Sequence, residues 1–150
     1  MNNVAKLLCT IALSSFYLTS SANECTLTVT STDMMQYDSK SLAVNKSCSS
    51  FSLELIHSGG LAKNVMGHNI VVVSTDEFNK VIALISMAEG IDNGFLPNDP
   101  AILAKTPMIG GGEKTQINID LGSFEIGKDY TFFCSFPGHY AIMRGKLAIL

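Results

Sequence analysis

The chain has 150 residues, of which 47% are hydrophobic and 15% are charged, and its formal net charge is −3. This size and composition predict one globular domain with a core large enough to fold alone. The acidic balance, the scattered Lys and Arg residues and a Gly110–Gly112 run without the Lys-Ser/Thr of a phosphate loop argue against binding of nucleic acid or nucleotide phosphates.

The first 22 residues differ in kind from the rest of the chain. Lys6 precedes the apolar run LLCTIALSSFYL, and small residues follow at Ser20, Ser21 and Ala22. A positive charge, a short apolar run and a small-residue cleavage site are typical of a secretory signal peptide. The run is shorter than the roughly 20 residues of a membrane-spanning helix. We predict a signal peptide over 1–22 and an exported soluble domain over 23–150; a buried N-terminal helix is the alternative for the first segment.

Six segments of the exported part alternate or run apolar, with many β-branched and aromatic residues, which predicts short strands. They are CTLTVTS (25–31), SFSLELIH (50–57), NIVVVS (69–74), TQINIDL (115–121), DYTFFC (129–134) and RGKLAIL (144–150). Between Val73 and Gly90 the apolar spacing becomes helical, with Ser74 and Glu77 as a candidate capping box. The pattern predicts an all-β sandwich of two sheets with one helical insertion.

The cysteines are odd in number once Cys9 leaves with the signal peptide. Cys25, Cys48 and Cys134 remain, and in an oxidising compartment two of them are expected to pair. Cys25 and Cys48 both lie in the N-terminal half, so their pairing would leave Cys134 as a free thiol. Burial in the apolar core is the simplest explanation for such a thiol.

The residues that follow Cys134 supply another explanation. The stretch CSFPGHYAIM (134–143) brings Cys134, His139 and Met143 into one loop, which Pro137 and Gly138 force to turn. A thiolate, an imidazole and a thioether are soft donors that suit copper rather than magnesium or calcium. The loop can wrap one point, so we predict a copper site there.

A further ligand must come from elsewhere in the chain, and His57 and His68 are the candidates. His68 lies just before the apolar strand NIVVV and is favoured, whereas His57 is predicted to be a hydrogen-bonded structural histidine. Two imidazoles and a thiolate in a plane, with a weak axial methionine, form a blue copper site that cycles between Cu(I) and Cu(II). Because protein ligands fill every in-plane position, an open catalytic site is disfavoured and we predict that the protein is not an enzyme.

Three other interpretations fit the sequence less well. A cysteine hydrolase would use Cys134 as nucleophile, but no Asp or Asn partner that would orient a histidine base is evident. A structural zinc domain usually employs more cysteines and no methionine. A copper storage or delivery protein usually exposes Met-rich or His-rich motifs, whereas the methionines here are dispersed.

The same residues carry a family resemblance. The chain resembles the azurins, a family of bacterial periplasmic cupredoxins, over essentially all of residues 23–150. The matching segments are NEC (23–25), VNKSC (44–48), KNVMGHN (63–69), MIGGGEKTQINIDL (108–121) and YTFFCSFPGHYAIMRGKL (130–147). The resemblance implies an eight-stranded Greek-key sandwich, a Cys25–Cys48 disulfide and one copper ion. The implied ligands are His68, Cys134 and His139, with a weak axial Met143 and the backbone carbonyl of Gly67.

The resemblance also implies supporting residues and partners. Asn69 would tie the His68 loop to the Cys134 loop, while Phe136 and Met35 would shield the copper from water. An apolar partner patch would surround the edge of His139, formed by Leu61, Met66, Met87, Phe136, Pro137, Gly138 and Ala141. The implied partners are c-type cytochromes, nitrite reductases or peroxidases, met by a periplasmic monomer. The chain departs from the family at Ile70, where azurins commonly bury a tryptophan, and it contains no tryptophan.

Overall fold

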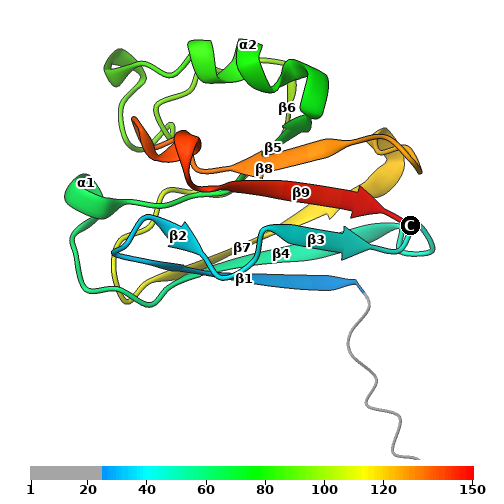
Figure 1. Cartoon of the computed structure of the whole chain (residues 1–150), viewed down its shortest axis with the longest axis horizontal. Coiled ribbons are helices and arrows are strands. Elements are labelled where there is room, and N and C mark those ends of the chain that lie inside the picture. Colours follow the sequence, from blue (N-terminus) through cyan, green and yellow to red (C-terminus); the bar gives the residue numbers. More distant parts are fainter. Residues whose placement is uncertain (1–24) are drawn as a thin grey trace, which may run out of the picture.

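Two β-sheets face each other and a helical segment covers the outer face of one of them (Figure 1). The computed structural model describes residues 25–150, so the signal peptide predicted at 1–22 lies outside the described residues. The strands are β1 (Thr26–Thr32), β2 (Gln36–Tyr37), β3 (Ser41–Val44), β4 (Ser50–His57), β5 (Val71–Ser74), β6 (Ile102–Lys105), β7 (Lys114–Asp120), β8 (Tyr130–Phe133) and β9 (Arg144–Ile149). The α-helices are α1 (Lys63–Met66) and α2 (Phe78–Ala83), and 3₁₀ turns span Thr75–Glu77, Met87–Glu89, Leu121–Ser123 and His139–Ala141.

The sheets have four and five strands, in the orders β2-β1-β4-β7 and β3-β9-β8-β5-β6. The strand β1 runs parallel to β4, and β3 runs parallel to β9, whereas the other pairs are antiparallel. The two-sheet sandwich with a helical insertion is therefore confirmed. The strands that the pattern missed, β2, β3 and β6, all lie at sheet edges and have only two to four residues, too few for a clear alternating pattern.

The alternation of side chains along β4 explains how the core forms. Phe51, Leu53, Leu55 and His57 are buried, whereas the residues between them are partly exposed. Successive side chains of a strand point to opposite faces, so these four share the face that meets the other sheet. Each large apolar side chain contributes about 1.5–3 kcal/mol when it leaves water. His57 is the last member of this buried row, which places its ring at one end of the sandwich.

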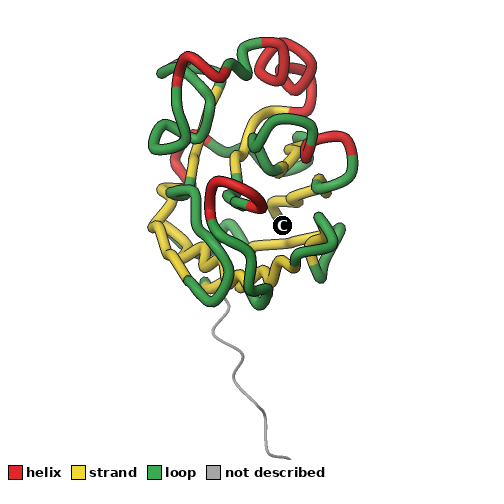
Figure 2. The backbone as a smooth tube through the Cα atoms, turned by 90° about the vertical axis from the view of Figure 1, so that its left-hand side faces the viewer, coloured by secondary structure: helices red, strands yellow, loops and turns green. Residues whose placement is uncertain are grey.

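The strand β8 is buried on both faces. Tyr130 and Phe132 join the core between the sheets, while Phe133 packs in a second cluster with Phe78 at the start of α2. The rings of Phe78 and Phe133 meet edge to face, with 5.2 Å between their centroids. The helical insertion therefore covers β5 and β8. Figure 2 shows the insertion on the side of the five-stranded sheet that faces away from the four-stranded sheet.

The insertion begins differently from the sequence prediction. Ser74 is the last residue of β5, and its side chain makes no capping hydrogen bond, so the capping box with Glu77 is wrong. A 3₁₀ turn instead leads into α2. The helix α2 ends at Ala83, so the prediction that the helix runs to Gly90 is wrong. Gly90 instead follows the separate turn Met87–Glu89, with a φ of 73°, a conformation that favours glycine.

The cysteines are arranged as expected. Cys25 and Cys48 form a disulfide, and Cys134 is a free, buried cysteine. None of the helices within residues 25–150 has the length and apolar character needed to cross a bilayer.

Candidate metal centre

Side chains alternate between the two faces of a strand, and this alternation along β5 and β8 brings His68 and Cys134 together. Ile70 and Phe132 both belong to the core between the sheets. His68 precedes Ile70 by two residues and Cys134 follows Phe132 by two, so both side chains continue on that inner face. Because β5 and β8 are antiparallel neighbours, with Val71 opposite Phe133, the two side chains meet at one end of the sandwich.

Three donor atoms converge at this end. The Nδ1 atoms of His68 and His139 are 3.3 Å apart. The Sγ of Cys134 lies 3.7 Å from His139 Nδ1 and 3.9 Å from His68 Nδ1. All three residues are buried, and they form a group that could hold a metal ion.

The spacing of these donors fits a planar metal site. Metal–nitrogen bonds of about 2.0 Å and metal–sulfur bonds of about 2.3 Å are usual for imidazole and thiolate ligands. With about 120° between the bonds, the two nitrogens would be about 3.5 Å apart, and each would lie about 3.7 Å from the sulfur. The observed separations agree with these values, and the donor set of two imidazoles and one thiolate is the one that copper prefers in a trigonal site.

The backbone fixes the orientation of the His68 ring. Its Nε2 lies 2.9 Å from the carbonyl oxygen of Thr32, a distance at which the ring N–H donates to that oxygen. The neutral ring therefore carries its lone pair on Nδ1, the atom that faces Cys134. The role of Thr32 leaves no signal in the sequence, because a main-chain carbonyl contributes regardless of residue type.

Phe136 holds the His139 ring in place. It begins the 3₁₀ turn His139–Ala141, and its amide donates to the carbonyl of Phe136 at 2.9 Å. The Phe136 ring stacks on the imidazole, with 4.5 Å between centroids. Gly138, just before the turn, has a φ of 86°, which a glycine adopts without strain.

Burial keeps this centre electrically neutral in the absence of an ion. It raises the pKa of the Cys134 thiol to about 11, although backbone N–H groups of Asn69 and Phe136 oppose the shift. Burial lowers the pKa of both His68 and His139 to about 4. A bound cation would reverse this preference at the sulfur and displace the thiol proton. The complete burial of Cys134 also leaves no path for a substrate to a nucleophilic thiol.

Met143 and Gly67 lie beside the three donors. Met143 is fully buried, and its main chain is bonded to two of them: its carbonyl accepts from the Cys134 amide and its amide donates to the His139 carbonyl. The carbonyl oxygen of Gly67 is 3.9 Å from Cys134 Sγ. A Cβ at position 67 would lie 2.3 Å from the Lys63 carbonyl oxygen, so this close approach requires glycine.

Hydrogen bonds of Asn69 join the two segments that carry the donors. Its Oδ1 accepts from the Ser135 amide and its Nδ2 lies within bonding distance of Ser135 Oγ, both at 2.9 Å. The hydroxyl of Tyr37, also buried, donates to the Asn69 carbonyl. Neither Tyr37 nor Ser135 is predicted from the sequence, since only the folded chain brings them to Asn69.

His57 lies next to the centre but outside the donor group. Its ring stacks on that of His68, with centroids 4.5 Å apart. The Gly59 amide donates to Nδ1 at 3.0 Å, and Nε2 faces the Met66 carbonyl at 2.9 Å, so both ring nitrogens have backbone partners. These contacts agree with the prediction of a hydrogen-bonded structural histidine.

The residues of the predicted partner patch differ in exposure. Met87 is 72% and Leu61 42% exposed, Gly138 and Ala141 are exposed, and Met66, Phe136 and Pro137 are half-buried. Met35, predicted to shield the metal, is half-buried and packs against the core. Ile70 is fully buried, so it fills the core position where a tryptophan was expected.

The chain is similar to known copper proteins along almost its whole described length. Residues 23–150 match the family model of copper-binding proteins of the plastocyanin/azurin family. An azurin of Pseudomonas fluorescens biotype A is 46% identical over 127 residues, covering 84% of this chain and 98% of that protein. The Bordetella pertussis azurin is 43% identical over 130 residues, or 86% of each chain. The solved azurin Az-iso2 of Methylomonas sp. strain J superposes with a TM-score of 0.79 at 40% identity, covering 84% of this chain and 98% of the other.

Proposed function

We propose, from the fact that this chain belongs to the plastocyanin/azurin family of copper-binding proteins, that it carries single electrons between redox proteins of the periplasm. The chain is a blue copper electron-transfer protein that binds one copper ion, and it is not an enzyme. The observation that supports the proposal most directly is the buried triad His68, Cys134 and His139, whose donors face one point.

The ligand set is part of the proposal. His68, Cys134 and His139 would be the strong copper ligands, and the Met143 thioether and the Gly67 carbonyl would be weak ones. Bound copper supplies the exchange of one electron between Cu(I) and Cu(II). The two oxidation states prefer different geometries, so ligands held in a compromise position need little rearrangement.

The chain itself provides this rigidity. The Thr32 carbonyl fixes the His68 ring, Phe136 stacks on His139, and Asn69 links the two ligand segments. Such contacts to groups behind the ligands orient them and exclude water. Met35 is proposed to contribute to the same shielding.

The proposal also includes the cellular location of the protein and the surface that contacts its redox partners. Residues 1–22 would direct export and be removed, leaving 23–150 as the mature monomeric domain. The apolar side chains near His139, among them Leu61 and Met87, would meet a c-type cytochrome, nitrite reductase or peroxidase. A small apolar contact with few charge pairs suits a complex that must dissociate quickly.

An optical titration of the reduced, metal-free protein with Cu(II) tests the ligand assignment. We expect an intense blue colour that saturates at one copper per chain, from charge transfer out of the Cys134 thiolate. The Cys134→Ser variant should remain colourless, whereas His57→Gln should keep the spectrum. A blue Cys134→Ser variant, or a folded but colourless His57→Gln variant, would overturn the assignment.

Stopped-flow kinetics test the contact face. Met66→Lys should leave the visible spectrum unchanged and slow electron exchange with a cytochrome or between two copies of the chain. Ile126→Lys is the matched control, because Ile126 is 66% exposed and precedes β8, at the opposite end of the sandwich from the donors. Equal rates for both variants and the parent protein would remove Met66 from the face.

A further inference from the structure

A cationic hollow lies on the outer face of the five-stranded sheet, away from the metal centre. Its volume is about 380 Å³, within the range of small-molecule sites. The side chains that line it are Lys40, Thr75, Phe78, Thr131, Arg144 and Lys146. Three of these six carry a positive charge and none carries a negative one, although the chain as a whole has a net charge of −3.

Strand pairing creates this concentration of charge. Leu147 and Ile149 of β9 face the core, so Arg144 and Lys146 alternate onto the outer face. Lys146 lies opposite Ser41 of β3, which brings Lys40 to the same place, and opposite Thr131 of β8. The start of α2 forms the wall, where the Arg144 guanidinium lies 5.3 Å from the centre of the Phe78 ring.

The cations retain free hydrogen-bond donors. Lys40 Nζ donates one hydrogen to the Ile142 carbonyl at 2.7 Å, which holds the ammonium over β9 and leaves two hydrogens available. Within residues 25–150, no carboxylate oxygen lies within 4.0 Å of Lys40, Arg144 or Lys146.

The threonines at the floor add one more donor. The hydroxyl oxygens of Thr75 and Thr131 are 3.0 Å apart. A hydrogen bond between them uses the hydrogen of one hydroxyl, so the hydrogen of the other can reach a ligand. Phe78 and the methylene stems of the long side chains offer apolar surface beside these polar groups.

We propose that this hollow binds a small organic carboxylate with an apolar body. The carboxylate would accept hydrogen bonds from the ammonium groups, the guanidinium and a threonine hydroxyl, while its apolar part would lie against the Phe78 wall. Charged and hydroxyl donors beside an aromatic wall suit such an anion, because charge-assisted hydrogen bonds hold the carboxylate while the ring contacts its apolar body.

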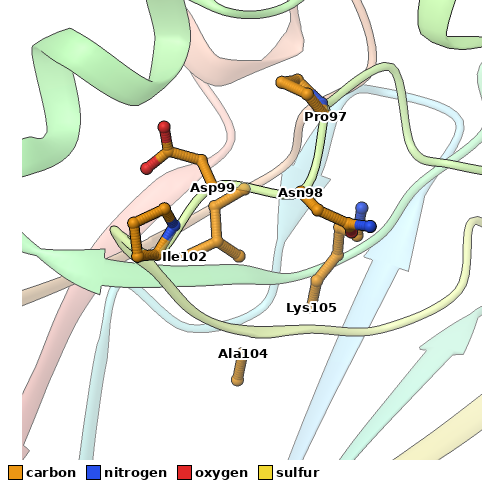
Figure 3. A pocket seen from close by; sticks show the side chains of 7 residues that line it. Pro97, Asn98, Asp99, Ile102, Ala104 and Lys105 are labelled. Atoms are coloured by element: carbon orange, nitrogen blue, oxygen red, sulfur yellow. The ribbon is translucent and has the colours of Figure 1, made fainter.

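A second hollow of similar size shows what distinguishes the cationic one. It has a volume of about 370 Å³ and contains both Asp99 and Lys105 (Figure 3). The carboxylate of Asp99 lies in the same hollow as Lys105, and the Lys105 ammonium has two carbonyl partners, Asn93 at 2.7 Å and Leu96 at 3.5 Å. This hollow carries no comparable preference for an anion, and Lys105 therefore serves as a control.

The test uses the copper-loaded, reduced protein, whose amide signals are followed by NMR at constant ionic strength. The probes are benzoate, acetate, inorganic phosphate and polyglutamate. We expect benzoate to shift the amides of Thr131 and Gly145 saturably and to bind at least about fivefold more tightly than acetate or phosphate, since about 1 kcal/mol of apolar contact corresponds to that ratio.

Lys40→Gln and Lys146→Gln should each weaken benzoate binding about fivefold, the effect of one partly exposed charge, and Lys105→Gln should not. Both positions are exposed, so the variants should fold, as circular dichroism can verify. No saturable shift, or equal binding by all three variants, would overturn the proposal. Phosphate binding as tight as benzoate would also overturn it, as would binding of polyglutamate alone, which would indicate an acidic protein partner.

Discussion

Replacing Asn69 with alanine should destabilise the metal-free protein by about 2–4 kcal/mol. The side chain is fully buried and makes two bonds of 2.9 Å, one from the Ser135 amide to Oδ1 and one between Nδ2 and Ser135 Oγ. Loss of the bond to Ser135 Oγ costs about 1 kcal/mol, and leaving the buried Ser135 amide without an acceptor costs about 1–3 kcal/mol, which together give about 2–4 kcal/mol. Ser135 is fully buried, so water does not replace the lost acceptor without a rearrangement.

Guanidinium unfolding at pH 7 measures this change directly. Asn118→Ala is the matched control, because Asn118 is exposed on β7 and such substitutions usually change stability by less than about 0.5 kcal/mol. The copper-loaded Asn69→Ala variant should also show a shifted reduction potential, since its ligand segments are no longer joined. A loss below about 0.5 kcal/mol with an unchanged potential would refute the argument that Asn69 connects the two segments.

Three further predictions concern the axial ligand, acid pH and the disulfide. Met143→Leu should stay blue and raise the reduction potential, because a weak axial thioether favours Cu(II); a folded variant that binds no copper would contradict this role. The metal-free protein should lose stability as the pH falls from about 6.5 to about 4, seen by urea unfolding. Burial lowers the pKa of His68 and His139 to about 4, so in this window the unfolded chain binds protons that the native chain does not. The slope should flatten in a His68→Gln, His139→Gln double variant. Removing both disulfide cysteines should cost about 3 kcal/mol for their sequence separation of 23, measured by guanidinium unfolding.

Local patterns predicted much of the fold because they reflect the faces of individual elements. The alternation in 50–57 identified β4, and the structure shows that the buried row of this strand ends at His57. The prediction failed where a tertiary contact decides the local conformation. Ser74 has a side chain suited to capping, yet it completes β5 through its pairing with Tyr130 of β8, so it does not cap the following turn.

The candidate metal centre was likewise predictable only in part. Cys134, His139 and Met143 lie within ten residues, and a short loop can bring them together whatever the rest of the chain does. His68 comes from a distant segment, and the pairing of β5 with β8 decides its approach to Cys134. The donor separations of 3.3–3.9 Å are likewise a property of the folded chain.

The sandwich class, the soft donor set and the odd cysteine could be predicted because they depend on residue type and short-range spacing. Three contacts could not be predicted: the Thr32 carbonyl that orients His68, the Tyr37 hydroxyl that meets Asn69, and the approach of Lys40 to Arg144 and Lys146 around one hollow. Each of these contacts joins segments far apart in the chain, where strand order and register bring them together. No local pattern encodes that register, since it results from the packing of all the strands at once.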